Sequence, residues 1–169
     1  VERVGKDVKL FKAGDQVFGH TDMHLGAYAE YLAIPENGTL AIKPDNLTHT
    51  EAAVIPFGGA TALHFLKKAA IKPGQKVLIN GASGAVGSAA VQLAKHFGAI
   101  VTGVCSTANI DLVKSLGAHH VIDYTKEDFT RNGDIYDVIF DTVNKVSFSR
   151  SVKSLSKGGI LILSSAGMP

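Results

Sequence analysis

Glycines at fixed spacing, between an apolar run and an amphipathic segment, are the residues of this chain best suited to chemistry. Residues 76–80 lead into Gly81-Ala-Ser-Gly-Ala-Val-Gly87. Written as A-x-G-x-x-G, the pattern puts Ala82 at the bend, Gly84 where backbone approaches a pyrophosphate, and Gly87 where a helix packs on the strand. The residues expected to contact the phosphates of a dinucleotide are Ala82, Ser83, Gly84, Ala85, Val86 and Gly87.

The segments on either side of the turn predict a strand before it and a helix after it. Val77, Leu78 and Ile79 form a short aliphatic run that is typical of a strand buried on both faces. Apolar residues then recur at helical spacing over 86–97, and Gly98 is expected to end that helix. A helix that begins at the turn directs unpaired N–H groups and positive dipole toward an anion. A glycine-rich turn alone also arises for backbone reasons, so its interpretation depends on the elements that come later in the chain.

Strands and helices alternate through the remaining sequence. Repeated alternation at this spacing predicts an α/β fold with a Rossmann-type, doubly wound parallel sheet and right-handed crossovers. The expected strands are 100–104, 120–122, 137–140 and 159–163, and the expected helices are 109–116 and 146–155.

The first 55 residues have a different texture, with short strand-like pieces at 16–18 and 27–34 separated by turn residues. We therefore expect a β-rich domain over 1–55 and the nucleotide domain over 56–169.

A helix is expected at the junction of these domains, because Thr48 and Glu51 have capping-box spacing. Pro56 and the glycine pair at Gly58 predict that this helix is short, and a second helix is expected over 60–70.

Composition narrows the class of protein. The chain has 169 residues and a net charge of +2, without a basic stripe interleaved with aromatics, so nucleic acid is not an expected partner. No apolar run has membrane-spanning length, so no membrane partner is expected, and residues 1–11 do not resemble a signal peptide. Cys105 is the only cysteine, which excludes an internal disulfide. The expected location is cytoplasmic.

The end of the second nucleotide-domain strand predicts which cofactor is preferred. An acidic residue there would hold the ribose hydroxyls of NAD, but the sequence reads Cys105-Ser106-Thr107. Without a carboxylate to repel a 2′-phosphate, NADP(H) is the expected cofactor. Ser106 is expected to donate a hydrogen bond to that phosphate and Lys114 to supply charge, while Asp111 counts against the assignment.

Other polar residues come after the later strands. Thr142 and Ser165 stand at the carboxyl ends of parallel strands, where open α/β sheets bind ligands, and are expected to line the nicotinamide half. Asp141 is expected to tether a neighbouring loop, and the His119-His120 pair is expected to have a structural or surface role. Cys105 is expected to be a small core residue. No residue is assigned a catalytic role, because a nicotinamide itself carries the hydride.

These motifs together resemble the medium-chain dehydrogenase/reductase superfamily, in its zinc-free quinone oxidoreductase branch. The resemblance covers nearly the whole chain and keeps the family order. It is carried by Phe11-Lys-Ala-Gly-Asp-Gln-Val-Phe18, Gly26-Ala-Tyr-Ala-Glu-Tyr31, the glycine turn, Leu116-Gly-Ala118 with Val121-Ile-Asp-Tyr124, and Tyr136-Asp-Val-Ile-Phe-Asp-Thr-Val143.

The resemblance implies further expectations. Residues 1–55 would be part of a GroES-like catalytic domain, and the nucleotide domain would lack its C-terminal end, so the chain would be a fragment and a poor enzyme alone. Thr61 would approach the phosphate or nicotinamide, and Tyr124 would border the 2′-phosphate or pack beneath the adenine. Asn109 stands where the family usually has a basic residue. The whole protein would transfer hydride from NADPH to a quinone or an α,β-unsaturated carbonyl, and would form a homodimer.

Zinc is not expected. One cysteine excludes a four-cysteine structural lobe, and by resemblance Phe57 replaces the last catalytic cysteine. His20 and His24 have i, i+4 spacing but lack an evident third ligand, which favours a solvated loop. Two alternatives stay open: a fragment of a zinc-dependent alcohol dehydrogenase, and a nucleotide-binding protein without catalysis.

Overall fold

The fold is taken from a computed structural model, which describes residues 1–21 and 24–164. The chain divides into two compact units, Val1–Phe57 and Gly58–Pro169, each of which is described by itself.

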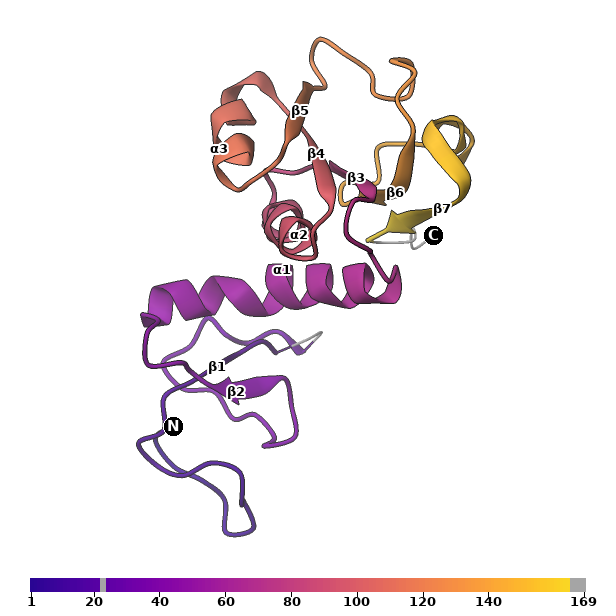
Figure 1. Cartoon of the computed structure of the whole chain (residues 1–169). Helices are drawn as coiled ribbons and strands as arrows, with labels where there is room; N and C mark the ends of the chain where they lie inside the picture. The colour runs from indigo at the N-terminus through magenta and orange to yellow at the C-terminus, as the bar shows by residue number, and fades with distance from the viewer. Residues whose placement is uncertain (22–23, 165–169) are drawn as a thin grey trace. The chain divides into compact units, whose positions relative to one another are not determined.

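The second unit is built on a five-stranded parallel sheet (Figure 1). Its strand order is β5-β4-β3-β6-β7. Strands β4 and β5 are therefore added on one side of β3 and strands β6 and β7 on the other, so that the strand order reverses between β3 and β6. This is the Rossmann-type arrangement predicted from the alternation of elements. The strands are β3 (Lys76–Asn80), β4 (Ile100–Cys105), β5 (His120–Asp123), β6 (Tyr136–Asp141) and β7 (Leu155–Leu163).

The central strand β3 is buried on both faces, as its sequence predicts. Val77 and Ile79 belong to one apolar cluster and Leu78 to the other, because successive side chains of a strand point to opposite faces. The first cluster is covered by helices, which contribute residues such as Leu66, Val91 and Val113. On the other face, the loop between β5 and β6 inserts the buried ring of Phe129.

Two glycines end helices at the positions predicted from the sequence. Helix α2 (Ala85–His96) is followed by Gly98 at φ +82°, and α3 (Ile110–Ser115) by Gly117 at φ +108°. Both values lie in the left-handed region that glycine tolerates at helix C-termini. A 3-10 turn, η2 (Thr107–Asn109), precedes α3.

The segment before the last strand differs from its prediction. Instead of one helix over 146–155, α4 (Phe148–Ser151) is followed by a 3-10 turn, η3 (Val152–Ser154), and β7 begins already at Leu155. Leu155 pairs with Tyr136, but pairing resumes only where Ile160 meets Val138. The extra residues bulge out, and Gly158 at φ +81° allows the chain to return to the sheet.

Helix α1 (His49–Lys68) is continuous, so the expected interruption at Pro56 and Gly58 is wrong. The capping box at its start is confirmed: Glu51 N–H donates to Thr48 Oγ1 at 3.2 Å, and Thr48 N–H donates to Glu51 Oε2 at 2.9 Å. Gly58 is explained by packing, because a Cβ there would lie 2.5 Å from the carbonyl oxygen of Ala85.

The first unit contains one antiparallel pair, β1 (Val17–Gly19) and β2 (Leu40–Ile42). The expected strand at 27–34 is wrong, since these residues form bends and irregular backbone in which Tyr28 and Tyr31 are exposed. The assignment of 1–55 to a GroES-like domain remains a prediction. Among the residues that the structure describes, no helix combines the length and the apolar character needed to cross a bilayer.

Candidate functional site

The glycine turn joins the carboxyl end of β3 to the start of α2. The N–H groups of Gly81 and Ala82 both donate to Val104 O, at 3.1 and 2.9 Å, which anchors the turn to β4. Gly81, at φ +81°, makes the sharp bend that the sequence pattern assigned to Ala82. Ala82 is instead fully buried beneath the turn.

The other two glycines are required for different reasons. A Cβ at Gly87 would lie 2.0 Å from Gly81 O, so the helix can approach the turn only with glycine there. Gly84 has φ −78° and ψ 173°, which any residue adopts, and the nearest atom to its Cβ position is Gly81 O at 3.5 Å. Nothing in the part of the chain that the structure describes therefore demands glycine at 84, and a ligand at the exposed surface of the turn would explain it.

The start of α2 is open to such a ligand. No side chain of residues 1–21 or 24–164 caps it, and its first turn holds no acidic residue. Ser88 N–H bonds to Gly84 O at 2.8 Å, while the N–H groups of Ala85, Val86 and Gly87 precede the first intrahelical bond. With Ser83 half-buried and Ala85 exposed beside them, these groups form a positive helix end that suits a phosphate.

Helix α1 borders the same turn. Its Gly58 packs so closely against α2 that a Cβ there would lie 2.5 Å from Ala85 O, and Thr61 lies one helical turn further along α1. The half-buried Thr61 is thus placed on the side of α1 that includes Gly58.

Thr142 and Asp141 occupy the point where the strand order reverses. Thr142 Oγ1 donates to Asn80 O at 2.8 Å, which holds the end of β6 against the end of β3. The fully buried Asp141 accepts from Asn80 Nδ2 at 3.0 Å and from the N–H groups of Val143 and Val146. Asp141 therefore tethers the loop after β6, as predicted. Ser165 lies outside the described residues.

The carboxyl ends of β4 and β5 bring Ser106 and Tyr124 to one edge of the sheet. Ser106 Oγ accepts from Asn109 Nδ2 at 3.1 Å, and Tyr124 N–H donates to Cys105 O at 3.0 Å while its side chain is 63% exposed. Lys114 is exposed in the last turn of α3, which leads away from that edge toward the start of β5. The structure thus places Lys114 apart from the other predicted cofactor residues.

A carboxylate that sequence reasoning missed stands at this edge. Asp123, the last residue of β5, accepts from Thr107 Oγ1 at 2.5 Å, from Thr125 Oγ1 at 2.7 Å and from Thr125 N–H at 3.0 Å. These hydrogen bonds, that of Thr107 foremost, lower the pKa of Asp123 from 3.8 to about 2. The end of β4 carries no carboxylate, as the sequence indicates, but its neighbour β5 brings Asp123 to the same level, because Asp123 is paired with Cys105 across the sheet.

Two other candidates are structural, as expected. Cys105 is buried in the apolar core, and burial, followed by the charge of Asp123, raises the pKa of its thiol. His119 Nδ1 accepts a hydrogen bond from Val101 N–H at 3.0 Å, which joins the start of β5 to β4 at the opposite edge.

In residues 1–21 and 24–164, no group of three or more His, Cys, Asp or Glu residues is placed to hold a metal ion. His24 is exposed, and its N–H donates to Thr21 O at 2.9 Å.

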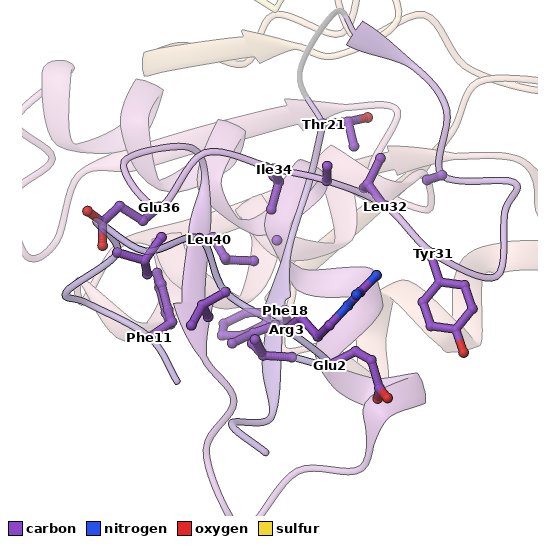
Figure 2. A pocket seen from close by; sticks show the side chains of 18 of the residues that line it. Glu2, Arg3, Phe11, Phe18, Thr21, Tyr31, Leu32, Ile34, Glu36 and Leu40 are labelled. Atoms are coloured by element: carbon purple, nitrogen blue, oxygen red, sulfur yellow. The ribbon is translucent and has the colours of Figure 1, made fainter. Parts of the chain in front are cut away.

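A hollow of about 1170 Å³ lies in the first unit (Figure 2). Its walls come from residues 1–40, where Phe11, Phe18 and Leu40 contribute apolar surface and Glu2, Arg3 and Glu36 contribute charge. None of the predicted cofactor residues is among those that line it.

The strand order and the glycine turn define a Rossmann-type α/β domain, and comparison with known proteins narrows the class. The zinc-binding dehydrogenase family matches residues 85–168. The chain is 41% identical to 2-methylene-furan-3-one reductase of Solanum lycopersicum over all of this chain and 45% of that protein. It is 37% identical to the chloroplastic NADPH-dependent alkenal/one oxidoreductase of Arabidopsis thaliana, covering 96% of this chain and 44% of that protein.

Among solved structures, the quinone oxidoreductase from Coxiella burnetii superimposes with a TM-score of 0.85 at 36% identity, covering 94% of this chain and 50% of that chain. The chain belongs to the medium-chain dehydrogenase/reductase superfamily, among relatives named as quinone and alkenal oxidoreductases. It spans about half the length of these relatives.

Proposed function

We propose that this chain is the dinucleotide-binding part of an oxidoreductase that transfers hydride from NADPH to a quinone or an α,β-unsaturated carbonyl. The observation that carries the proposal is the open start of α2, where uncapped N–H groups meet a glycine that the fold itself does not require. The relatives named above act on acceptors of this kind, and one of them is named as NADPH-dependent.

In this proposal the pyrophosphate lies over Gly84 and accepts hydrogen bonds from the N–H groups at the start of α2. Ser106 and Tyr124 border the 2′-phosphate, and Thr142 and Thr61 lie beside the nicotinamide half of the cofactor. Ser165 is assigned to the same side by its position after β7. Lys114 is the weakest member of the set, because it lies in the last turn of α3.

The bound nicotinamide supplies the hydride, and the residues of this chain bind and orient the cofactor. With an enone as acceptor, the cofactor would supply hydride for the β-carbon, and solvent would supply the proton for the α-carbon. No side chain of the site is needed as an acid or base, which agrees with the structural roles of Asp141 and Cys105.

We further propose that the reaction needs no zinc. The single cysteine and the Phe57 position support this, although the matched family is described as zinc-binding. Activity that survives exhaustive chelation would agree with the proposal. Activity that chelation abolishes and zinc restores would favour the alternative, a zinc-dependent alcohol dehydrogenase.

The test of the proposed reaction is NADPH oxidation by the whole protein, followed at 340 nm against a panel of quinones and enones. We expect turnover with at least one acceptor class, and little or none by the 169-residue chain alone. Tight NADPH binding without turnover on any acceptor would instead favour a nucleotide-binding protein that does not catalyse hydride transfer.

Location and assembly are also proposals. We place the whole protein in the cytoplasm, which imaging of a fluorescent fusion tests against the chloroplast or mitochondrion named for several relatives. Strand β7 is an edge strand of the sheet in the part of the chain that the structure describes, and an unpaired edge favours association between copies. We propose a homodimer, which light scattering of the whole protein tests.

A further inference from the structure

The carboxylate of Asp123 connects two strand ends that are far apart in the sequence. Its Oδ2 accepts from Thr107 Oγ1, which follows β4, and its Oδ1 accepts from the N–H and hydroxyl of Thr125, which follows β5. The two strands are already in register at this level, where Cys105 pairs with Asp123. The carboxylate therefore extends the connection between β4 and β5 past the end of the sheet.

Asp123 is enclosed while its charge partner is not. The residue is 9% exposed, and Lys126, whose side chain is 69% exposed, places Nζ 3.6 Å from Oδ2. A carboxylate that accepts three hydrogen bonds stays ionised at neutral pH, consistent with its lowered pKa. It therefore keeps accepting from both threonines under assay conditions.

These contacts fix the neighbours of both residues proposed to border the 2′-phosphate. Ser106 lies between Cys105, which accepts from Tyr124 N–H, and Thr107, which donates to Asp123. Tyr124 lies between Asp123 and Thr125, which are bonded to each other. Each of the two is held on both sides along the chain, and Asp123 takes part on both strands.

We infer that Asp123 is a positioning residue for recognition of the 2′-phosphate: through Thr107 and Thr125 it sets the spacing between Ser106 and Tyr124 without touching the cofactor. The inference rests on the proposed NADPH site and adds to it the residue that fixes its geometry. It also accounts for a carboxylate near a site for a phosphate dianion, because the hydrogen bonds and Lys126 offset its charge.

The matched control is Asp137, which joins neighbouring strands in the same way at the amino ends of the strands of the same sheet. Asp137 accepts from Lys76 N–H at 2.9 Å and from Ser156 Oγ at 3.0 Å, so it too connects neighbouring strands. It lies at the second residue of β6, where the strand begins, away from the carboxyl edge of the sheet. Asp137→Ala therefore controls for loss of a carboxylate that bridges strands.

The experiment is calorimetric titration of NADPH and NADH into the 169-residue chain and its Asp123→Ala, Asp123→Asn and Asp137→Ala variants. We expect Asp123→Ala to weaken NADPH binding about tenfold while NADH changes less than about twofold. Asp123→Asn should retain NADPH binding, because the amide can still accept from Thr125 and donate to Thr107 Oγ1. Asp137→Ala should leave the ratio of the two affinities unchanged.

Three results would overturn the inference. Equal losses for both nucleotides in Asp123→Ala would reduce Asp123 to a general structural role. Tighter NADPH binding in both Asp123 variants would make it a repulsive charge, and unchanged affinities for both nucleotides would give it no part in recognition. If Asp123→Ala does not fold, Thr107→Val breaks the same contact at an exposed position and should lower the NADPH to NADH affinity ratio severalfold. Wild-type chain that binds neither nucleotide would contradict the proposed function itself.

Discussion

Gly84 and Gly87 differ in what would oppose a side chain at each position, and this separates a ligand requirement from a folding requirement. At Gly84 a Cβ would make only an ordinary contact with the protein, whereas at Gly87 it would collide with backbone. The sequence pattern alone treats the two as equivalent members of one motif.

We therefore predict that Gly84→Ala leaves the melting temperature nearly unchanged but weakens NADPH binding by about tenfold or more, about 1.4 kcal/mol. Gly87→Ala should instead destabilise the fold by about 1–3 kcal/mol or more, because backbone must move to admit the methyl group. Thermal melting and calorimetry on both variants check this. A Gly84→Ala chain that binds NADPH as tightly as wild type would remove the ligand explanation.

Asp123 predicts a pH dependence with a defined sign. Its pKa in the folded chain, about 2, is below its ordinary value of 3.8, because Thr107 and then Thr125 donate to the charged form. The folded state therefore binds this proton less readily than the unfolded state, so Asp123 stabilises the fold above about pH 4 and loses this effect as pH falls toward 2. Lys126 supports the charged form, and the nearby Cys105 thiol is neutral at these pH values.

Urea unfolding of wild type and Asp123→Asn between pH 5 and pH 2 measures this contribution. The stability difference between the two proteins should shrink as the pH falls. A difference that stays constant over this range would mean that the carboxylate is not preferentially stabilised in the folded state.

How far the site can be predicted from sequence depends on whether its residues are close along the chain. The turn from Gly81 to Gly87 is one local segment, so its spacing alone predicts a strand, a bend and a helix start. Thr107 and Asp123 are sixteen residues apart and meet only through the register of β4 and β5. No local pattern could reveal that contact, which is why the carboxylate was missed.

Elements were predicted best where a single physical cause decides them. The inner strands β3, β4 and β6 follow from short apolar runs that are buried on both faces. The segment 27–34 also has a strand-like sequence, but among the described residues it has no neighbouring strand to pair with. The helix expected to reach residue 155 ends early because Leu155 pairs with Tyr136, a long-range contact that helical spacing does not show.

Helix α1 shows that two residues with the same helix-breaking tendency can have opposite effects. Pro56 costs α1 a backbone hydrogen bond, so Pro56→Ala should stabilise the chain by up to about 3 kcal/mol. Gly58→Ala should destabilise it by about 1–3 kcal/mol despite the better helix propensity of alanine, because its Cβ meets Ala85 O. Urea unfolding of the two variants compares these signs, and stabilisation by Gly58→Ala would contradict the close packing at the site.

For the whole molecule, the apolar core is unevenly divided between the two units. Both apolar clusters consist of residues between 62 and 162, whereas in the described part of Val1–Phe57 the buried residues are Lys43, Ala52 and Pro56. Large apolar side chains such as Leu10, Tyr28 and Leu32 are exposed in this first unit. Its backbone hydrogen bonds therefore have little apolar burial to stabilise them.

Hydrogen exchange should report this difference directly. We expect the amides of β3, β4 and β6 to exchange slowest, near the rate set by global unfolding, and those of β1 and β2 to exchange orders of magnitude faster. Mass spectrometry of peptides from each unit measures both classes. Equal protection in the two units would contradict the uneven division of the core.

The central claim is that this chain binds a dinucleotide at the open start of α2 and distinguishes NADPH from NADH. Parallel calorimetric titration of the 169-residue chain with the two nucleotides tests it most directly, since it needs neither acceptor nor turnover. The account predicts binding of one equivalent of NADPH, about tenfold or more tighter than NADH. Binding of neither nucleotide would contradict the assigned site, and equal or tighter binding of NADH would contradict the recognition of a 2′-phosphate by Ser106 and Tyr124.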